Sequence, residues 1–413
     1  ENANSPYSSI GIGNVSNSGF AMNRSLGGIT TAFLSPVNIN YHNPASYASI
    51  RLTTLETALD VKNVWLRQNE LSQSSGDASL GYAALAFPIS NYGGLSIGVL
   101  PFSKVNYDVT ETVENELLGG TQDYRFLGDG QTHQFYIGGA FKVKLNKTQI
   151  SFGANGAFLF GALSKEVRVN FPELTNAFTT RRTETNNFRG FTWNTGLLIT
   201  QPLKDDASFV TIGVSARPNI GTHVERDILW DRIVENSNIV SVVDTLSLTG
   251  VTDGEIDIPS LFSVGIMYSN KNSLIIGTDV SFEKWEDFRD FGDINTAMVN
   301  ATKVSFGVGF VPSPKNLGRS FGDYFSRVHY RLGGRYNTGN IMLEGNRISE
   351  YAITAGMGLP LRRSAVGSSG TLNFSFEIGQ RGSIDNNLIR ETFLNTTIGI
   401  SLNDIWFIKR KFN

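Results

Sequence analysis

Residues 372–379, Leu-Asn-Phe-Ser-Phe-Glu-Ile-Gly, alternate apolar side chains with polar or small ones at every position. A second run of this kind lies at 394–403, Leu-Asn-Thr-Thr-Ile-Gly-Ile-Ser-Leu-Asn, and a third at 304–310. Successive side chains of a β-strand point to opposite faces, so each run predicts a strand with one apolar face. In a membrane barrel such a strand turns the apolar face to lipid and the other face to the lumen.

The same pattern recurs from about residue 50 to the end of the chain and predicts a transmembrane antiparallel β-barrel of about fourteen strands. Fourteen is an even number, as in bacterial single-chain barrels. A soluble β-sandwich is the alternative, but its exposed face would carry charge, whereas one face here is continuously apolar. The predicted strands lie near 51–64, 77–88, 92–101, 131–143, 147–162, 188–200, 207–217, 258–268, 272–283, 300–311, 325–337, 349–360, 369–380 and 392–403.

The connections between these strands alternate between long and short. Outer-membrane barrels have long extracellular loops and short periplasmic turns, so this alternation predicts that both termini lie in the periplasm. The long connections are 65–76, 102–130, 163–187 and 218–257, and the short ones are 89–91, 144–146, 201–206 and 269–271.

Composition favours a membrane barrel and excludes other classes. Charged residues make up 17% of the 413 residues, whereas soluble domains have about 25%. No apolar run reaches 18 residues, which excludes a helical membrane span. Cysteine is absent, so disulfides and cysteine-ligated metals are excluded, and the net charge of -2 gives no field for nucleic acid. The chain starts at Glu1 without the features of a signal peptide, and an exported barrel predicts that this is the mature numbering.

Residues 1–49 do not follow the strand pattern, and we predict that they form a hatch that plugs the barrel of residues 50–413. The segment is rich in Asn, Ser and Gly, but it has too many apolar residues for a solvated tail. A fourteen-stranded barrel has a lumen too wide for its own side chains to fill. The apolar residues are Ile10, Ile12, Val15, Phe20, Met22, Leu26, Ile29, Phe33, Leu34 and Ile39.

A short motif, Asn43-Pro44-Ala45, stands just before the first predicted strand, and residues 5–13 and 24–28 precede it with Ser-Pro-Tyr-Ser-Ser-Ile-Gly-Ile-Gly and Arg-Ser-Leu-Gly-Gly. These stretches resemble the FadL/TodX family of outer-membrane proteins, in a branch typical of Bacteroidota. The resemblance implies passive uptake of hydrophobic small molecules, such as long-chain fatty acids, across the outer membrane of a Gram-negative bacterium. It also implies that Asn43, Pro44 and Ala45 are the hatch motif, and the alternative is a plain turn into the first strand.

In that family the ligand leaves sideways into the membrane when the hatch moves, often beside a kinked strand. Glycine and proline interrupt a strand ladder, so they are candidates for such a kink. The candidates in the third predicted strand are Gly93, Gly94, Gly98 and Pro101.

The strand predicted at 325–337 would carry an unusual number of cationic side chains on its lumen face. Buried charges need partners, so one hypothesis is an ion-pair network that grips the hatch. The other is a cationic site for the carboxylate or phosphate of an amphipathic ligand, which the fork of arginine suits. The candidate residues are Arg327, His329, Arg331 and Arg335, with Asp279, Glu283 and Glu377 from nearby strands.

Enzyme motifs occur only outside their structural context. Residues 94–98 match the G-x-S-x-G pattern, but they lie within a strand and no helix follows. Phosphate-loop and zinc-protease motifs are absent from the sequence. The sequence therefore predicts a protein that is not an enzyme and has no cofactor and no metal site.

Two functions remain open, because a fold does not by itself settle function. The first is an uptake channel with a hydrophobic ligand. The second is a non-transporting accessory barrel subunit of a multi-protein outer-membrane complex, for β-barrel assembly or type IX secretion. Membrane lipid and lipopolysaccharide are expected partners in both cases, other outer-membrane proteins in the second, and nucleic acid in neither. An apolar site in the barrel would favour the first function, and a rigidly filled lumen the second.

Overall fold

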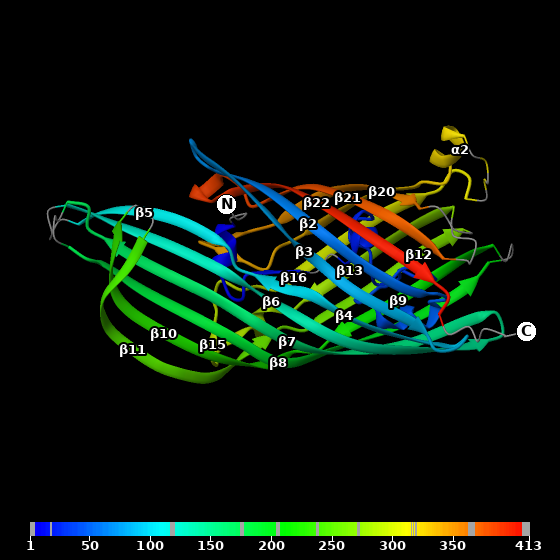
Figure 1. Ribbon diagram of the computed structural model, residues 1–413, viewed down its shortest axis with the longest axis horizontal. Helices are drawn as coiled ribbons and strands as arrows, with labels where there is room; N and C mark the ends of the chain where they lie inside the picture. Colours follow the sequence, from blue (N-terminus) through cyan, green and yellow to red (C-terminus); the bar gives the residue numbers. More distant parts are fainter. Residues whose placement is uncertain are drawn as a thin grey trace, which may run out of the picture.

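A computed structural model describes residues 5–16, 19–115, 120–173, 177–203, 207–236, 239–270, 273–314, 316, 318, 320–361 and 368–406. Its body is a closed barrel of fourteen antiparallel strands that follow one another in chain order (Figure 1). The last strand, β22 (Arg390–Asp404), pairs with the first, β2 (Thr53–Gln68), and this pairing closes the ring. The prediction of an all-β barrel with about fourteen strands is confirmed.

Three positions in the ring are shared by two consecutive strand segments. β5 (Tyr107–Asn115) continues β4, β10 (Ile220–Asn236) continues β9, and β11 (Ile239–Ile258) leads into β12. The other ring strands are β3 (Leu71–Pro88), β4 (Gly93–Lys104), β6 (Gly120–Leu145), β7 (Thr148–Asn170), β8 (Thr179–Pro202), β9 (Ser208–Arg217), β12 (Leu261–Asn270), β13 (Leu274–Glu283), β16 (Ala301–Phe310), β17 (His329–Asn337), β20 (Glu350–Pro360) and β21 (Ser369–Arg381).

The two faces of the strands differ as the alternation predicts. On β8, Phe191 and Trp193 are 75% and 51% exposed, whereas Thr192 and Asn194 are 4% and 7% exposed. The apolar side chains therefore lie on the outside of the ring, where lipid covers them in a membrane barrel. No helix among the described residues has the length and apolar character needed to cross a membrane.

All four segments predicted as long loops, 65–76, 102–130, 163–187 and 218–257, are mostly β-structure where the structure describes them. β6 and β7 stay paired from Leu145↔Thr148 to Asp123↔Asn170, well beyond the predicted strand ends. Figure 1 shows these extensions, with β5, β10 and β11, reaching beyond the other strands at the end opposite the C-terminus. The loop prediction was wrong because the apolar outer face stops at the extension while the hydrogen-bond ladder continues.

Two prolines interrupt the ladder where the extension begins. Pro218 separates β9 from β10, and Pro259 separates β11 from β12. The breaks lie opposite each other, because Arg217 pairs with Leu261 and Ile220 pairs with Ile258. Proline has no backbone N–H to donate. Because the two prolines lie opposite each other, both strands lose their hydrogen bonds at the same place, and few are lost in total.

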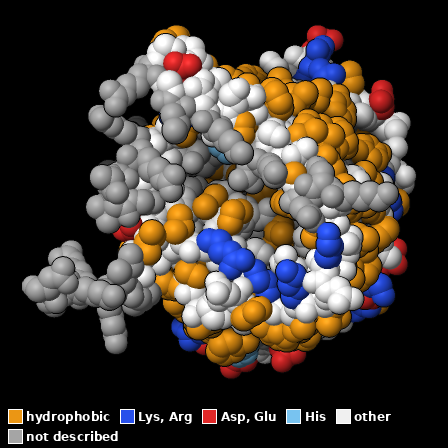
Figure 2. Space-filling view, turned by 90° about the vertical axis from the view of Figure 1, so that its right-hand side faces the viewer, with side chains coloured by type: hydrophobic (Ala, Val, Ile, Leu, Met, Phe, Trp, Pro, Cys, Tyr) orange, Lys and Arg blue, Asp and Glu red, His pale blue; other side chains and the backbone are white. Residues whose placement is uncertain are grey.

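The end of the barrel that bears the C-terminus has mostly short turns. The exception is the connection between β16 and β17, which includes the short helix α2 (Phe321–Phe325) with a capping box between Ser320 and Asp323. Figure 2 looks onto this end and shows apolar side chains over much of its flank, with Lys and Arg side chains gathered near its centre. That this end faces the periplasm stays a prediction.

Candidate functional site

The described N-terminal residues 5–16 and 19–50, called the inner segment below, run inside the ring of strands (Figure 1). They form η1 (Pro6–Ser9), β1 (Asn14–Val15), α1 (Ala21–Arg24) and η2 (Pro44–Ser49), and most of their described side chains are buried. Lumen-facing carboxylates of the barrel accept hydrogen bonds from this segment. Asp279 of β13 accepts from the backbone N–H groups of Thr30 and Thr31, both at 2.7 Å. The segment is thus bonded to the wall through its main chain.

The predicted hatch motif lies fully buried where the inner segment meets β8. Asn43 caps η2, because its side-chain oxygen accepts from the backbone N–H of Ala45 at 3.2 Å, and Pro44 starts the helix. The Asn43 amide donates to the carbonyl of Thr31 at 2.6 Å and to that of Leu197 on β8 at 3.4 Å. The motif is therefore a turn that also ties the inner segment to itself and to the wall. Its role as a hatch motif stays a prediction.

Glycines stand in the barrel wall where the main chain of the inner segment touches it. A Cβ atom at Gly213 would lie 2.0 Å from the carbonyl oxygen of Thr31, and one at Gly307 would lie 2.4 Å from that of Leu26. Larger residues would therefore displace the inner segment or the strand. Five further wall glycines would place a Cβ atom within 2.5 Å of the inner segment: Gly94, Gly153, Gly196, Gly333 and Gly356.

The lumen charges form a network around Arg335 of β17. Its guanidinium lies 2.6 Å from Glu350 and 3.0 Å from Glu377, and Asn395 donates to Glu377 at 2.9 Å. All these side chains are mostly shielded from solvent. Buried charges need partners, and each charge in this network has one. Arg335 and Glu377 both belong to the predicted lumen cluster, and the structure places them in contact.

The other residues of the predicted cluster lie apart from this network. Arg331 donates to the side chain of Asn373 at 2.9 Å, and Glu283 accepts from the indole of Trp285 at 2.5 Å. Arg327 precedes β17 and donates to the backbone of Asp323, because the strand begins only at His329. The single cationic cluster that the spacing predicted is therefore divided into separate contacts.

Arg24 of the inner segment is the cation that sequence reasoning did not place. It lies 2.7 Å from Asp60 of β2 and donates to Thr397 of β22 at 3.0 Å. Thr397 in turn donates to Asp60 at 2.7 Å. The inner segment is therefore tied to the seam where the first and last strands close the ring. Strand alternation could not reveal this contact, because Arg24 belongs to no strand.

An apolar cluster lies in the lumen on the side of the strand extensions. The connection between β13 and β16 folds inward, and its Trp285, Phe288 and Met298 are at most 4% exposed. They pack with Ile12 of the inner segment and with lumen-facing residues of the wall. The other members of this cluster are Phe102, Val105, Tyr107, Leu159, Leu163, Phe188, Val224, Ile256, Ile258 and Ala301.

The strand predicted to be kinked parts from its neighbour. β3 and β4 pair only from Pro88↔Gly94 to Ala83↔Val99, and beyond this point β1 of the inner segment pairs with β4 instead. The register of β4 against β6 also shifts between Pro101 and Ser103. An ion pair between Lys104 and Asp77 spans the opening between the two strands. Of the candidate kink residues, Gly94 and Gly98 lie in the paired part, and Pro101 lies at the shift.

A cavity of about 300 Å³ reaches from this opening into the lumen. Residues of β1, β3 and β4 line its outer part, and Arg24, Asp60, Arg335 and Glu377 line its inner part. The lining is rich in charged side chains of both signs. Such a lining suits water and polar groups better than an apolar ligand, because burying a charge against hydrocarbon is costly.

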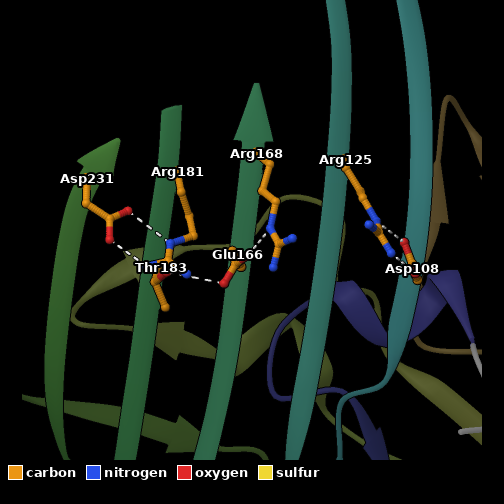
Figure 3. A network of polar contacts seen from close by, with 7 residues as sticks. All are labelled: Asp108, Arg125, Glu166, Arg168, Arg181, Thr183 and Asp231. Atoms are coloured by element: carbon orange, nitrogen blue, oxygen red, sulfur yellow. Dashed lines mark hydrogen bonds and ion pairs between the residues drawn. The ribbon is translucent and has the colours of Figure 1, made fainter. Parts of the chain in front are cut away.

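A row of ion pairs crosses the strand extensions (Figure 3). Arg125 of β6 holds Asp108 of β5 with two bonds of 2.9 and 2.8 Å, and Arg181 of β8 holds Asp231 of β10 with bonds of 2.9 and 2.5 Å. Between them, Arg168 and Glu166 pair on β7. Alternation places this row on the face opposite the apolar cluster, so it lies on the outside of the extension.

His42 of the inner segment is neutral at ordinary pH. Burial, together with the positive charges of Lys303, Arg217 and Arg24, lowers its pKa to about 3. Its ring lies edge-on to that of Tyr41, with centroids 5.6 Å apart. The histidine is therefore a packed neutral group and adds no cation to the lumen.

This architecture defines a class: an outer-membrane β-barrel with the FadL-like fold. A FadL homologue from Pseudomonas aeruginosa has a TM-score of 0.56 with 12% identity, covering 95% of this chain and 98% of that one. The toluene transporter TodX of P. putida gives 0.56 with 12% identity over 95% and 100%, and TbuX of Ralstonia pickettii gives 0.57 with 13% over 94% and 99%. At these identities the likeness is one of fold.

The model of the BamG family matches residues 1–413, and the chain belongs to that family. No curated protein sequence matches it. TodX and TbuX are described as toluene transporters, and the likeness in fold to such proteins agrees with the prediction that this chain is not an enzyme. The predicted resemblance to the FadL/TodX family is confirmed.

Proposed function

We propose that this protein is a non-transporting structural subunit of a multi-protein outer-membrane complex, with β-barrel assembly as the process it serves. The observation that carries the proposal is the glycine-lined contact between the barrel wall and the inner segment, exemplified by Gly213 against Thr31. A plug that must move to pass a ligand needs weak contacts with the wall. Here main-chain atoms abut main-chain atoms, and any displacement breaks buried hydrogen bonds.

Among the described residues, the interior of the barrel also lacks the open apolar path that uptake of a hydrophobic molecule needs. The cavity between Asp77, Asp60 and Arg335 is lined by charges, and the rings of Trp285 and Phe288 pack in an apolar cluster toward the extensions. A hydrophobic ligand would have to open that apolar cluster and then pass a charged chamber. Both steps are costly.

The strand extensions supply a surface for a partner. Long loops that capture ligands are commonly mobile, whereas these segments are paired strands braced by the ion pairs of Figure 3. A rigid surface loses little conformational entropy on binding, which favours stable association. Membership of the BamG family is consistent with a subunit of an outer-membrane complex.

The test is a disulfide that locks the inner segment to the wall. An ideal Cβ at Gly399 lies 2.9 Å from the Cβ of Ala21, and a small adjustment reaches the 3.5–4.5 Å or so that a disulfide needs. The chain has no cysteine, so Ala21→Cys with Gly399→Cys forms one defined bond. The two single-cysteine variants and the reduced double variant are the matched controls.

Cells that carry only the locked barrel should grow normally and should keep normal levels of other outer-membrane barrels. The locked barrel should also co-purify from native membranes with the same proteins, in the same stoichiometry, as the unlocked one. If the barrel instead purifies alone with a bound apolar molecule, and locking abolishes uptake of a labelled long-chain fatty acid that reduction restores, the structural role is wrong.

Uptake of hydrophobic molecules is the second candidate, and one observation favours it. β3 and β4 separate beyond Ala83↔Val99, and residues of both strands next to this separation, such as Asp77 and Lys104, line the cavity. In this reading, the pair of Lys104 with Asp77 closes the opening. Lys104→Ala would then increase fatty-acid uptake, whereas a structural subunit would show the same uptake with and without this change.

A further inference from the structure

The outer face of the β10–β11 hairpin brings together three side chains that commonly bind metals. They are His223 and Glu225 of β10 and Asp253 of β11, and one possible ligand atom from each lies within 4.8 Å of the others. No other such group of three occurs in the described part of the chain. The imidazole Nε2 of His223 lies 3.7 Å from Oδ1 of Asp253.

The strand register produces this arrangement. Glu225 and Asp253 are directly paired across the two strands, and His223 lies two residues before Glu225 on the same face. Val224, between them, points the other way and is fully buried in the apolar cluster. Because the hairpin is fixed on its inner side, the three side chains project from a rigid base, as a metal site requires.

We propose that His223, Glu225 and Asp253 form a binding site for a divalent transition metal, with Zn²⁺ as the best match. One imidazole nitrogen and two carboxylate oxygens suit zinc, whereas calcium and magnesium prefer oxygen ligands alone. Tetrahedral zinc with bonds near 2.1 Å sets its ligands about 3.4 Å apart, so small side-chain rotations close the site. The exposed side leaves a fourth position for water.

The surroundings favour a cation. Glu255 is paired with His223 across the strands, and Asp257 follows two residues later on the same face, so the local charge is negative. Arg189 of β8 lies 3.0 Å from Oε1 of Glu225, and its side chain is 63% exposed. An exposed ion pair of this kind is weak, and a carboxylate has a second oxygen for the metal. Arg189 can therefore stay bonded to one oxygen of Glu225 while the other oxygen binds the metal.

The test is direct metal binding by the full chain, purified in detergent and stripped with a chelator. Zn²⁺ is titrated calorimetrically, and Co²⁺ provides an absorption band that reports nitrogen and oxygen ligands. We expect one Zn²⁺ per chain. His223→Ala or Asp253→Asn should weaken binding by at least about tenfold and should remove the Co²⁺ band.

His133→Ala is the matched control, since His133 lies on the outer face of β6, where its ring packs near Phe160. This variant should bind as the unaltered chain does. Far-ultraviolet circular dichroism and gel mobility with and without heating should show that every variant retains the barrel. The site is refuted if the unaltered chain binds less than one equivalent, or if it binds no more tightly than the folded His223→Ala variant. Neither result depends on whether the barrel transports a ligand.

Discussion

Arg24 of the inner segment lies 2.7 Å from Asp60 of β2, with side chains only 16% and 23% exposed. This contact joins a residue outside the barrel strands to the strand that closes the ring. A largely buried ion pair adds little over an apolar contact, but it is destabilising when one partner is removed. The barrel is therefore expected to lose stability when the inner segment moves away and Asp60 loses its partner.

Replacing Asp60 by Asn should destabilise the protein, because Arg24 would keep a buried charge without its carboxylate partner. We expect a loss of about 3 kcal/mol in the free energy of unfolding, measured from urea unfolding in detergent by tryptophan fluorescence. Asp108→Asn, which breaks the exposed pair with Arg125 (37% and 43% exposed), should change it by less than about 1 kcal/mol. Equal losses of unfolding free energy in the two variants would contradict the role of the Arg24–Asp60 pair in holding the inner segment.

Two glycines of β7 should respond differently to the same change. A Cβ at Gly153 would lie 2.5 Å from the carbonyl carbon of Pro44, whereas one at Gly156 would meet nothing within 4 Å. Gly153→Ala should therefore cost about 1–3 kcal/mol, and Gly156→Ala should be neutral or slightly stabilising, because alanine loses less backbone entropy. Limited proteolysis should cut the inner segment only in the Gly153 variant. Protection in both variants would show that the wall tolerates a side chain at this contact.

Phe288 tests whether the inward-folded connection seals the lumen. The side chain is 1% exposed within the apolar cluster, so Phe288→Ala should cost about 3 kcal/mol through the cavity it leaves. The variant should also raise the single-channel conductance of the barrel in planar bilayers, and Phe288→Leu should give a smaller rise. If neither variant changes the conductance, another part of the molecule closes the lumen.

His42 predicts a loss of stability in acid. Its folded pKa of about 3 lies below the value near 6.5 of the unfolded chain, so the unfolded state binds an extra proton between these values. The contribution of His42 is complete above about pH 6.5 and declines as the pH falls toward 3. His42→Asn should flatten the dependence of the unfolding midpoint on pH in this window. An unchanged slope would mean that other groups cause the acid sensitivity.

Strand alternation by itself determined the class of fold. The period of two is local, because each side chain faces lipid or lumen according to its own position, so runs such as 372–379 and 394–403 identify strands without knowledge of their neighbours. Alternation did not predict the strand extensions within 163–187, where β7 and β8 continue beyond their predicted ends. Where the outer face of a strand is polar, apolar and polar residues no longer alternate. The strand then cannot be recognised from this pattern, although its hydrogen-bond ladder continues.

The sequence also determined that residues 1–49 were too apolar for a solvated tail, but only the tertiary structure decided what they touch. Gly213 and Thr31 are far apart in the chain, and their contact depends on how the ring closes. The Arg335–Glu377 pair could be proposed because alternation places both residues on the lumen faces of strands. Arg24 belongs to no strand, so alternation could not predict the direction of its side chain. The grouping of His223 with Asp253 required the exact register of two strands, and register depends on the whole hydrogen-bond ladder, because a shift of one residue would turn Asp253 to the opposite face.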